Sequence, residues 1–278
     1  MTGGKSEAGR GEAIRLVVSD VDGTLVDKKK RLTPATIDAV GKLRDAGLGF
    51  TIISARPRSG MMPIADTLEI DAPMGAFNGG TVFRRDGSVM CQHFIDRDVV
   101  EGMFTLAKDV NADVWLFADD RWYASTDQGE HVEHERIASD QEPVVTSDFT
   151  AFFDRADKIT FVSDDAKILA DLHTSAKPFG DKATIMQSQT YYLDVTALAA
   201  NKGDGITLLA KAMHTPLAVT CAIGDQANDV PMFARAGLSI AMGQGPAEVR
   251  AKADEVTASN DADGVAQAIS RIILGDQP

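Results

Sequence analysis

The hydrophobic pattern over residues 14–70 predicts the order strand, helix, strand, helix. Two apolar runs, residues 14–19 and 48–53, are typical of buried strands. Between them Thr33-Pro34 is a favourable helix start and Gly47 a favourable stop, and the apolar positions in between have helical spacing. Strands that alternate with helices pair in parallel through crossover connections. This part of the chain therefore predicts the first half of a parallel sheet.

The pattern changes after Asn78-Gly79-Gly80. The expected elements are then a hairpin over residues 81–90, a helix over 98–110, strands over 114–117, 121–124 and 159–162, a helix over 165–176 and a strand over 183–187. Hairpins mixed with helices indicate a separate α+β unit with an antiparallel sheet.

After residues 191–195, themselves interpreted as a strand, the alternating pattern returns. It predicts a helix after Lys202, strands over 217–223 and 238–242 with a helix over 229–236 between them, a short helix after Pro246 and an amphipathic helix over 265–273. The simplest fold is α/β: a doubly wound, Rossmann-like parallel-sheet core in two pieces, residues 13–82 and 191–278. An α+β domain, residues 83–190, is inserted between them. Residues 1–12, rich in glycine and charge, are expected to be a disordered tail.

Composition excludes several functional classes. The 278 residues carry a formal net charge of −13, which disfavours binding to nucleic acid or to an anionic membrane. An anionic substrate would therefore need a local positive site or a metal ion. The two cysteines form no disulfide framework, no apolar run approaches membrane-spanning length, and the first residues lack the apolar stretch of a signal peptide. A cytoplasmic location is expected.

Asp20-Val21-Asp22-Gly23-Thr24 is the most informative segment. Asp20 and Asp22 follow the first predicted strand directly, and ligands of open α/β sheets bind beyond the carboxyl ends of the strands. Two close carboxylates suit a hard metal ion, and they suit split roles in which one attacks and the other moves protons. The alternative is a solvated turn, in which Asp and Gly are common.

Three further segments with polar residues lie at strand ends or helix starts. Ser54-Ala55-Arg56 follows the second strand and offers a hydroxyl and backbone amides to an oxyanion. Asp225 follows the strand over 217–223, where it could complete a hard-metal site with Asp20. Lys202 precedes a helix and could neutralise a phosphate. Taken singly, the hydroxyl and amide groups could be helix caps and the lysine a solvated surface residue.

The order of these motifs, with an inserted unit between the second and third, resembles the haloacid dehalogenase (HAD) superfamily. More narrowly it resembles the Cof-like phosphatases, which carry a large α/β cap at this place. The resemblance runs from about residue 14 onward. The second motif, Ile53-Ser54-Ala55-Arg56, departs from the usual Ala-Thr-Gly-Arg, and Asn201 stands before Lys202 where a small residue such as serine is more usual. Neither change removes a catalytic group.

The resemblance implies a role for each candidate residue. Asp20 would be the nucleophile that forms an aspartyl phosphate, Asp22 the general acid and base, and Lys202 a further catalytic group. Mg²⁺ would be held by Asp20, the backbone carbonyl of Asp22, and Asp225, with Asp229 supporting the metal site without binding the ion. The phosphoryl oxygens would be held by Ser54, the amide of Ala55, Lys202 and Asn228.

The implied function is a Mg²⁺-dependent phosphatase for small phosphorylated metabolites such as sugar phosphates. One alternative is a phosphotransferase or phosphomutase that passes the phosphoryl group to a hydroxyl. A second is a non-catalytic, phosphate-binding regulator, and a third a receiver domain of the response-regulator kind. The intact set of Asp20, Asp22, Lys202 and Asp225 argues against the second, and the large insertion argues against the third.

Two other clusters have simpler interpretations. His131 and His134 would share a helix face and could bind a transition metal, but a surface helix of the inserted domain, or contact with substrate, is also consistent with them. The basic run Lys28-Lys29-Lys30-Arg31 is expected to be a solvated loop beside the active-site strand. Basic residues are otherwise too dispersed for a nucleic-acid surface.

Overall fold

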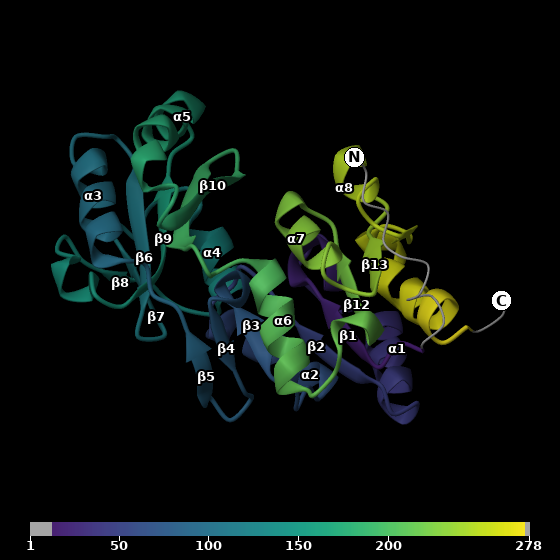
Figure 1. The fold of residues 1–278 in the computed structure, drawn as a ribbon. Coiled ribbons are helices and arrows are strands. Elements are labelled where there is room, and N and C mark those ends of the chain that lie inside the picture. The colour runs from purple at the N-terminus through teal and green to yellow at the C-terminus, as the bar shows by residue number, and fades with distance from the viewer. Residues whose placement is uncertain (1–12, 276–278) are drawn as a thin grey trace.

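The computed structural model describes residues 13–275, so the tail predicted for residues 1–12 lies outside the described residues. The chain forms two lobes (Figure 1). One is built on a parallel sheet with helices on both sides, and the other on a mostly antiparallel sheet. The predicted fold class, a doubly wound α/β core with an inserted domain, is confirmed. Within the described residues, no helix combines the length and apolar character needed to cross a membrane.

The core sheet has the strand order β14-β13-β12-β1-β2, and each neighbouring pair is parallel. Its strands are β1 (Leu16–Ser19), β2 (Gly49–Ile52), β12 (Thr220–Gly224), β13 (Leu238–Ala241) and β14 (Glu255–Val256). Its helices are α1 (Pro34–Asp45), α2 (Arg58–Leu68), α6 (Lys202–Ala212), α7 (Val230–Phe233), α8 (Ala247–Arg250) and α9 (Gly264–Gln267). α7 is shorter than expected, because it ends at Phe233. The helix predicted over 265–273 is confirmed, with α9 continued by a π-helix over Ala268–Ile273.

The side chains of β1 show why the core is doubly wound. Val17 packs among apolar residues of α1, α2 and α9, whereas Leu16 and Val18 pack with residues of α6 and α7. Successive strand residues point to opposite faces, so a strand with consecutive apolar residues needs helices on both sides. All three side chains are fully buried.

Two helix starts follow the sequence signals closely. The Thr33 side chain accepts a hydrogen bond from the Thr36 amide and begins α1. Asn201 caps α6 in the same way by accepting from the Asp204 amide at 2.9 Å. This cap fixes Lys202 as the first residue of α6, next to the carboxyl ends of the core strands.

A three-stranded antiparallel sheet adjoins the core. It consists of β3 (Met74–Ala76), β4 (Thr81–Phe83) and β5 (Val89–Gln92), and a parallel bridge between Ile53 and Gly75 connects it to the end of β2. The predicted hairpin over residues 81–90 is confirmed. It pairs with β3, however, and not with the sheet of the inserted domain.

The second lobe, here called the cap, has the strand order β10-β11-β9-β6-β7-β8. Its strands are β6 (Asp113–Ala118), β7 (Arg121–Ala124), β8 (Val144–Val145), β9 (Ala156–Val162), β10 (Ala183–Gln189) and β11 (Tyr192–Ala197). Residues of α3 (Arg97–Ala107) and α5 (Ala166–Ser175) cover one face of this sheet. On the other face, α4 (Val132–Ser139) contributes Val132 to a cluster with Trp115 and Trp122, and α4 also contacts α2 of the core.

The structure corrects two strand assignments. Residues 191–195 were expected in the core, but β11 pairs with β9 and β10 in the cap sheet. The strand expected over 217–223 begins only at Thr220, because residues 217–219 form a helical turn after Pro216. The strand pairings favour domain boundaries after β5 and after β11. We therefore propose residues 93–198 as the cap, in place of residues 83–190.

Candidate active site

The turn after β1 brings two distant carboxylates together. The Asp20 amide donates to the carbonyl oxygen of Ile223 at 2.8 Å, which ties the end of β1 to β12. Gly23 has a φ of +79°, and a Cβ at this position would lie 2.5 Å from Oδ2 of Asp225. Only glycine adopts this conformation cheaply and leaves room for the carboxylate. The turn can therefore lie directly against Asp225.

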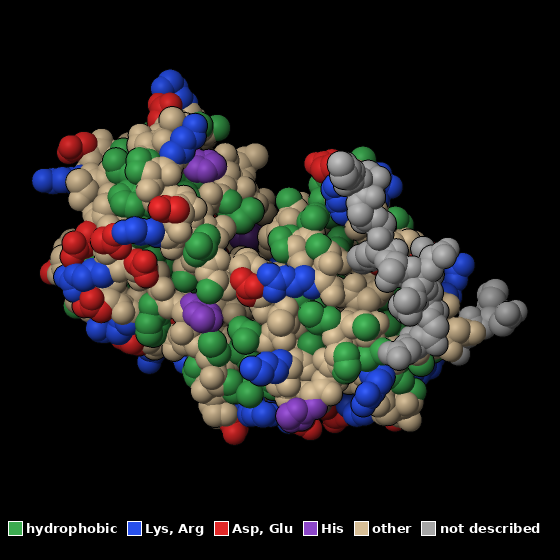
Figure 2. Space-filling view, in the orientation of Figure 1, with side chains coloured by type: hydrophobic (Ala, Val, Ile, Leu, Met, Phe, Trp, Pro, Cys, Tyr) green, Lys and Arg blue, Asp and Glu red, His purple; other side chains and the backbone are tan. Residues whose placement is uncertain are grey.

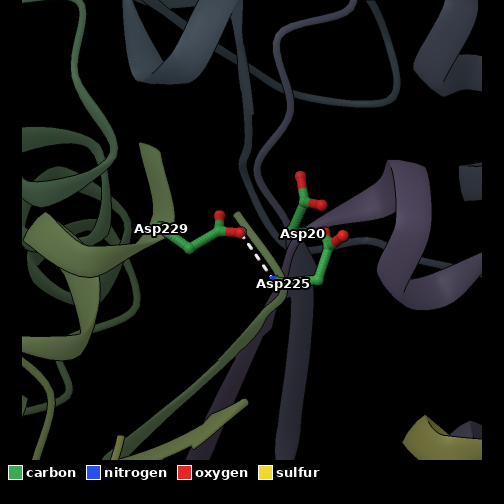
Figure 3. Close-up of side chains that lie close together, drawn as sticks. All are labelled: Asp20, Asp225 and Asp229. Atoms are coloured by element: carbon green, nitrogen blue, oxygen red, sulfur yellow. Dashed lines mark hydrogen bonds between the residues drawn. The ribbon is translucent and has the colours of Figure 1, made fainter. Parts of the chain in front are cut away.

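Asp20, Asp225 and Asp229 each offer a carboxylate oxygen within 4.8 Å of the others, and all three are buried (Figure 3). Asp229 is fully engaged: its Oδ2 accepts from the amides of Asp225 and Gln226, both at 2.8 Å, and its Oδ1 contacts Lys202 at 2.6 Å. The described contacts of Asp225 are hydrogen bonds from neutral side chains, Thr24 Oγ1 at 3.1 Å among them. Asp20 and Asp225 are therefore the pair with oxygens available to a cation.

Lys202 is the cation that pairs with two of these carboxylates. Its Nζ lies 2.5 Å from Oδ1 of Asp20 and 2.6 Å from Oδ1 of Asp229, and the side chain is 1% exposed. Burial alone would lower the pKa of the Lys202 ammonium, but the two carboxylates outweigh it and hold that pKa above its usual value. A buried ion pair of this kind fixes the orientation of the Asp20 carboxylate.

The site holds more negative charge than Lys202 balances. Burial raises the pKa of Asp20, and the nearby Asp229 and Asp225 raise it further, against the opposing effect of Lys202. Burial and the proximity of Asp229 likewise raise the pKa of Asp225. Carboxylate oxygens are the ligands that Mg²⁺ prefers, and a divalent cation would relieve this repulsion. The donor set therefore fits the expected metal.

Asp22 has a different environment from Asp20. Its Oδ2 accepts from Nε of Arg56 at 2.7 Å and its Oδ1 accepts from Nη2 of Arg56 at 2.8 Å, while Nζ of Lys30 lies 2.5 Å from Oδ1. Burial opposes ionisation, but these two cations hold the pKa of Asp22 well below its usual range. In this conformation Asp22 is an ionised carboxylate.

Sequence reasoning assigned no role to Arg56 or Lys30. Arg56 was visible as the last residue of the motif after β2, and Lys30 belongs to the basic run that was expected to be a solvated loop. Lys30 instead reaches Asp22 and lines the cavity, with its side chain 24% exposed. The signal that could have identified Lys30 was its place in a basic run, eight residues after the candidate acid Asp22.

A cavity of about 330 Å³ lies between the two lobes, where the surface is also hollowed in Figure 2. The core side of its lining includes the predicted residues Asp20, Asp22, Ser54, Ala55 and Asn228. Ser54 Oγ accepts from the Arg56 amide at 3.2 Å, and Asn228 Nδ2 donates to Oδ1 of Asn78 at 3.2 Å. Lys202 and Asp225 do not line the cavity. Lys202 contacts Asp20, and Asp225 lies beside Asp20 in the carboxylate cluster.

The cap supplies the opposite wall of this cavity, which sequence reasoning did not identify apart from the histidine-rich segment. Its polar members include Glu135 of α4, Lys158 of β9, and Tyr192 and Asp194 of β11. Asp194 inside the predicted strand 191–195 and Lys158 directly before the predicted strand 159–162 were the signal that could have found them. Such positions are normally hydrophobic.

His131, which precedes α4, and His134 within α4 do not act together. His134 lines the cavity, whereas His131 contacts Asp164 through Nε2 at 2.7 Å and stacks on Tyr191. Among the described residues, neither histidine belongs to a group that could hold a metal ion. The position of His134 agrees with contact with substrate, one of the alternatives left open by the sequence, and that contact stays a prediction.

Comparison with known proteins gives consistent matches over most of the chain. Residues 17–269 match the family of haloacid dehalogenase-like hydrolases. The chain is 26% identical over 249 residues to the HMP-PP phosphatase of Escherichia fergusonii, which covers 86% of this chain and 87% of that protein. A haloacid dehalogenase-like hydrolase from Bacteroides thetaiotaomicron has a similar crystal structure, with a TM-score of 0.85, 25% sequence identity, and coverage of 93% of this chain and 99% of that one.

One relative is considerably longer. The chain is 26% identical over 267 residues to the chloroplastic endoribonuclease YBEY of Arabidopsis thaliana, and this match covers 92% of the chain but 46% of that protein. The chain thus spans less than half the length of this relative.

Proposed function

Since the chain belongs to the family of haloacid dehalogenase-like hydrolases, we propose that it is a Mg²⁺-dependent phosphatase that hydrolyses small phosphomonoesters through an aspartyl phosphate. The observation that supports this best is Asp20, which lines the cavity between the lobes and is held there by the buried Lys202, with Asp225 beside it. The name of the relative from Escherichia fergusonii, a phosphatase, agrees with the proposal.

In the first step, a carboxylate oxygen of Asp20 attacks phosphorus. The new oxygen–phosphorus bond forms as the bond to the leaving oxygen breaks, and the product is a mixed anhydride on Asp20. Lys202 holds the carboxylate in place and offsets its charge, so that a second anion can approach.

Asp22 would move the protons. It would donate a proton to the leaving oxygen and then take one from the water that attacks the aspartyl phosphate, which returns Asp20 to its carboxylate form. Arg56 and Lys30 hold Asp22 ionised in the present conformation, the form that acts as a base. Its role as an acid requires that substrate binding weaken these contacts.

The remaining groups would hold the phosphoryl oxygens. Ser54 and the amide of Ala55 line the cavity at the end of β2, and Asn228 lines it before α7. Mg²⁺, held by Asp20, the Asp22 carbonyl and Asp225, would supply a Lewis acid that neutralises charge on the phosphoryl group. Its identity as magnesium rests on the oxygen-only donor set.

A phosphotransferase or phosphomutase with the same aspartyl phosphate remains the alternative. It would transfer the phosphoryl group to a substrate hydroxyl in place of water. Steady release of inorganic phosphate without an added acceptor favours the hydrolase. The expected partner, a small phosphorylated metabolite, and the expected cytoplasmic location remain predictions.

The test is phosphate release from a panel of metabolite phosphates, with Mg²⁺ and with EDTA, by the wild type and by Asp20→Asn. We expect release that needs Mg²⁺ and is abolished in the variant. Asp38→Asn is the matched control, because Asp38 is a surface carboxylate with 67% side-chain exposure. Near-normal turnover by Asp20→Asn would disprove the nucleophile assignment.

A further inference from the structure

The cap face that looks into the cavity carries polar side chains where a sheet face is normally apolar. We call Glu135, Lys158, Tyr192 and Asp194 the cap patch. Lys158 and Asp194 lie on adjacent strands, since β9 pairs with β11, and both lie on the sheet face opposite to the one that carries Ile159 and Val195. All four members line the cavity and are at least nine-tenths buried.

Lys158 and Asp194 of the cap patch form an ion pair with each other. Oδ1 of Asp194 accepts from Thr160 Oγ1 at 2.6 Å and lies 3.2 Å from Nζ of Lys158. The same ammonium lies 5.8 Å from the centroid of the Phe117 ring. The Lys158 charge is therefore already compensated by protein groups.

The other two members lack partners in the described part of the chain. The Tyr192 hydroxyl is buried without a hydrogen bond there. Glu135 is only 8% exposed, and no hydrogen bond to its carboxylate is described. A buried polar group without a partner is costly, and a buried carboxylate more so. Both residues line the cavity, and the Glu135 carboxylate can accept hydrogen bonds from a ligand there.

We propose that the cap patch binds the leaving group of the substrate, and that this leaving group presents hydroxyl or amino hydrogen-bond donors to Glu135 and has no negative charge. The inference rests on the proposed function, which places the phosphoryl group on the core side of the same cavity. It assigns Glu135 as a residue that selects the substrate.

The charge of the patch supports this choice. Glu135 and Asp194 are two anions against the single cation Lys158, so the patch has a net charge of −1 when Glu135 is ionised. Burial raises the pKa of Glu135 to about 7, against the opposing effect of Lys158, which shows that the site tolerates little additional negative charge. A leaving group with a carboxylate or second phosphate would be repelled.

The experiment compares matched substrates that differ in the charge of the leaving group. One pair is glucose 6-phosphate and 6-phosphogluconate, and the other is fructose 6-phosphate and fructose 1,6-bisphosphate. With Mg²⁺ present, we expect kcat/KM of the wild type to favour the neutral member of each pair by about tenfold or more. In Glu135→Gln this preference should fall by about tenfold, because the amide is uncharged and a weaker acceptor.

Glu133→Gln is the matched control. It makes the same substitution on the same helix, but Glu133 is a surface residue with 72% side-chain exposure and pairs with Arg136. Its substrate preference should equal that of the wild type. A Glu135→Gln enzyme that keeps the full preference overturns the proposal, as does a wild type that prefers the anionic members.

Tyr192→Phe provides a second variant that is expected to fold, because the hydroxyl it removes has no described partner. Its kcat/KM for glucose 6-phosphate should fall by about tenfold relative to p-nitrophenyl phosphate, whose leaving group has no aliphatic hydroxyls. An unchanged ratio would contradict a ligand-binding role for this hydroxyl. Should the wild type release phosphate from none of these compounds, the proposed phosphatase function itself would fail, which is a different result.

Discussion

Arg56 donates two hydrogen bonds to Asp22, from Nε to Oδ2 at 2.7 Å and from Nη2 to Oδ1 at 2.8 Å. Its Nη1 donates to the carbonyl oxygen of Gly60 at 3.0 Å. The arginine is 7% exposed. Gly60 lies in α2 at the point where this helix meets α4 of the cap. The proposed acid and base is thus connected through one side chain to the contact between the lobes.

Arg56→Ala should lower kcat by tenfold or more, because Asp22 loses its two-point orientation. Loss of the guanidinium should also raise the pKa of Asp22 toward its ordinary value. Activity that depends on ionised Asp22 should then fall off at a higher pH on the acid side. The measurement is the pH profile of kcat, with the surface variant Arg44→Ala as control. An unchanged acid limb would contradict the role given to Arg56.

Asp225→Ala should weaken Mg²⁺ binding well over tenfold. The substitution removes one of two carboxylates that have oxygens available to the ion. It also relieves repulsion within the cluster, since burial and Asp229 raise the pKa of Asp225, so the metal-free variant should be no less stable than the wild type. The measurement is the rise in Tm with added Mg²⁺, which should be present in the wild type and absent in the variant. An equal rise in both would mean that the metal site is misplaced.

Gly60→Ala should disturb the contact between the lobes. A Cβ at Gly60 would clash with the carbonyl oxygen of Ala138 in α4. Neighbouring bonds hold the same contact, with Ser59 Oγ donating to the Ser139 carbonyl at 2.5 Å and Gln141 Nε2 donating to Ser59 Oγ at 2.7 Å. We expect a loss of about 1–3 kcal/mol in stability and a lower kcat/KM.

Gly41→Ala is the matched control for this variant. Gly41 also lies inside a helix, α1, and the nearest atom to an added Cβ would be 4.0 Å away. Without a steric conflict, alanine should stabilise the helix by up to about 1 kcal/mol. Equal effects of the two substitutions on the free energy of unfolding, measured with urea, would show that the Gly60 contact carries no special constraint.

Asp157 should make stability depend on pH. This carboxylate of β9 is 3% exposed and accepts from Gln92 Nε2 at 2.7 Å and from Thr81 Oγ1 at 3.2 Å. Burial raises its pKa from 3.8 to about 6, so the folded protein binds a proton that the unfolded chain has already released. The stabilisation is full below pH 3.8 and is lost as the pH rises through about 6.

Asp157→Asn removes this titration and keeps the shape and the acceptor oxygen. Relative to the wild type, the variant should therefore gain about 2.4 kcal/mol between pH 4 and pH 8. The measurement is the difference in unfolding free energy at several pH values, with the surface variant Asp154→Asn as control. A difference that stays constant with pH would contradict the proton uptake.

The sequence correctly predicted the features that depend on residues close together in the chain. The apolar runs of β1 and β2, the Thr33 cap of α1 and the alternating order of elements each depend on neighbours in the chain. They led correctly to a doubly wound core. The positions of Asp20 and Asp225 also followed, because strand ends in a parallel sheet meet at one edge.

The errors concern partners that are distant in sequence. The run that became β11 is buried at every position, and nothing in its pattern distinguishes the cap sheet from the core sheet. The contact of Arg56 with Asp22 joins residues 34 apart, and Lys30 reaches Asp22 from a loop. Glu135 faces the cavity only because α4 is held against α2. Helical spacing alone cannot show which polar residue of a helix will be covered.

The division of the cavity between the two lobes has a consequence for how the protein can diverge. The groups proposed to handle phosphate come from the core, whereas the cap patch comes from the cap sheet and from α4. Substitutions in the patch can redirect the enzyme to new metabolites while the reaction itself is inherited unaltered. The exception is the chain that leaves β11, because it reaches Lys202 within five residues. The cap can therefore change in evolution, but the segment that connects β11 to Lys202 must keep its length and position.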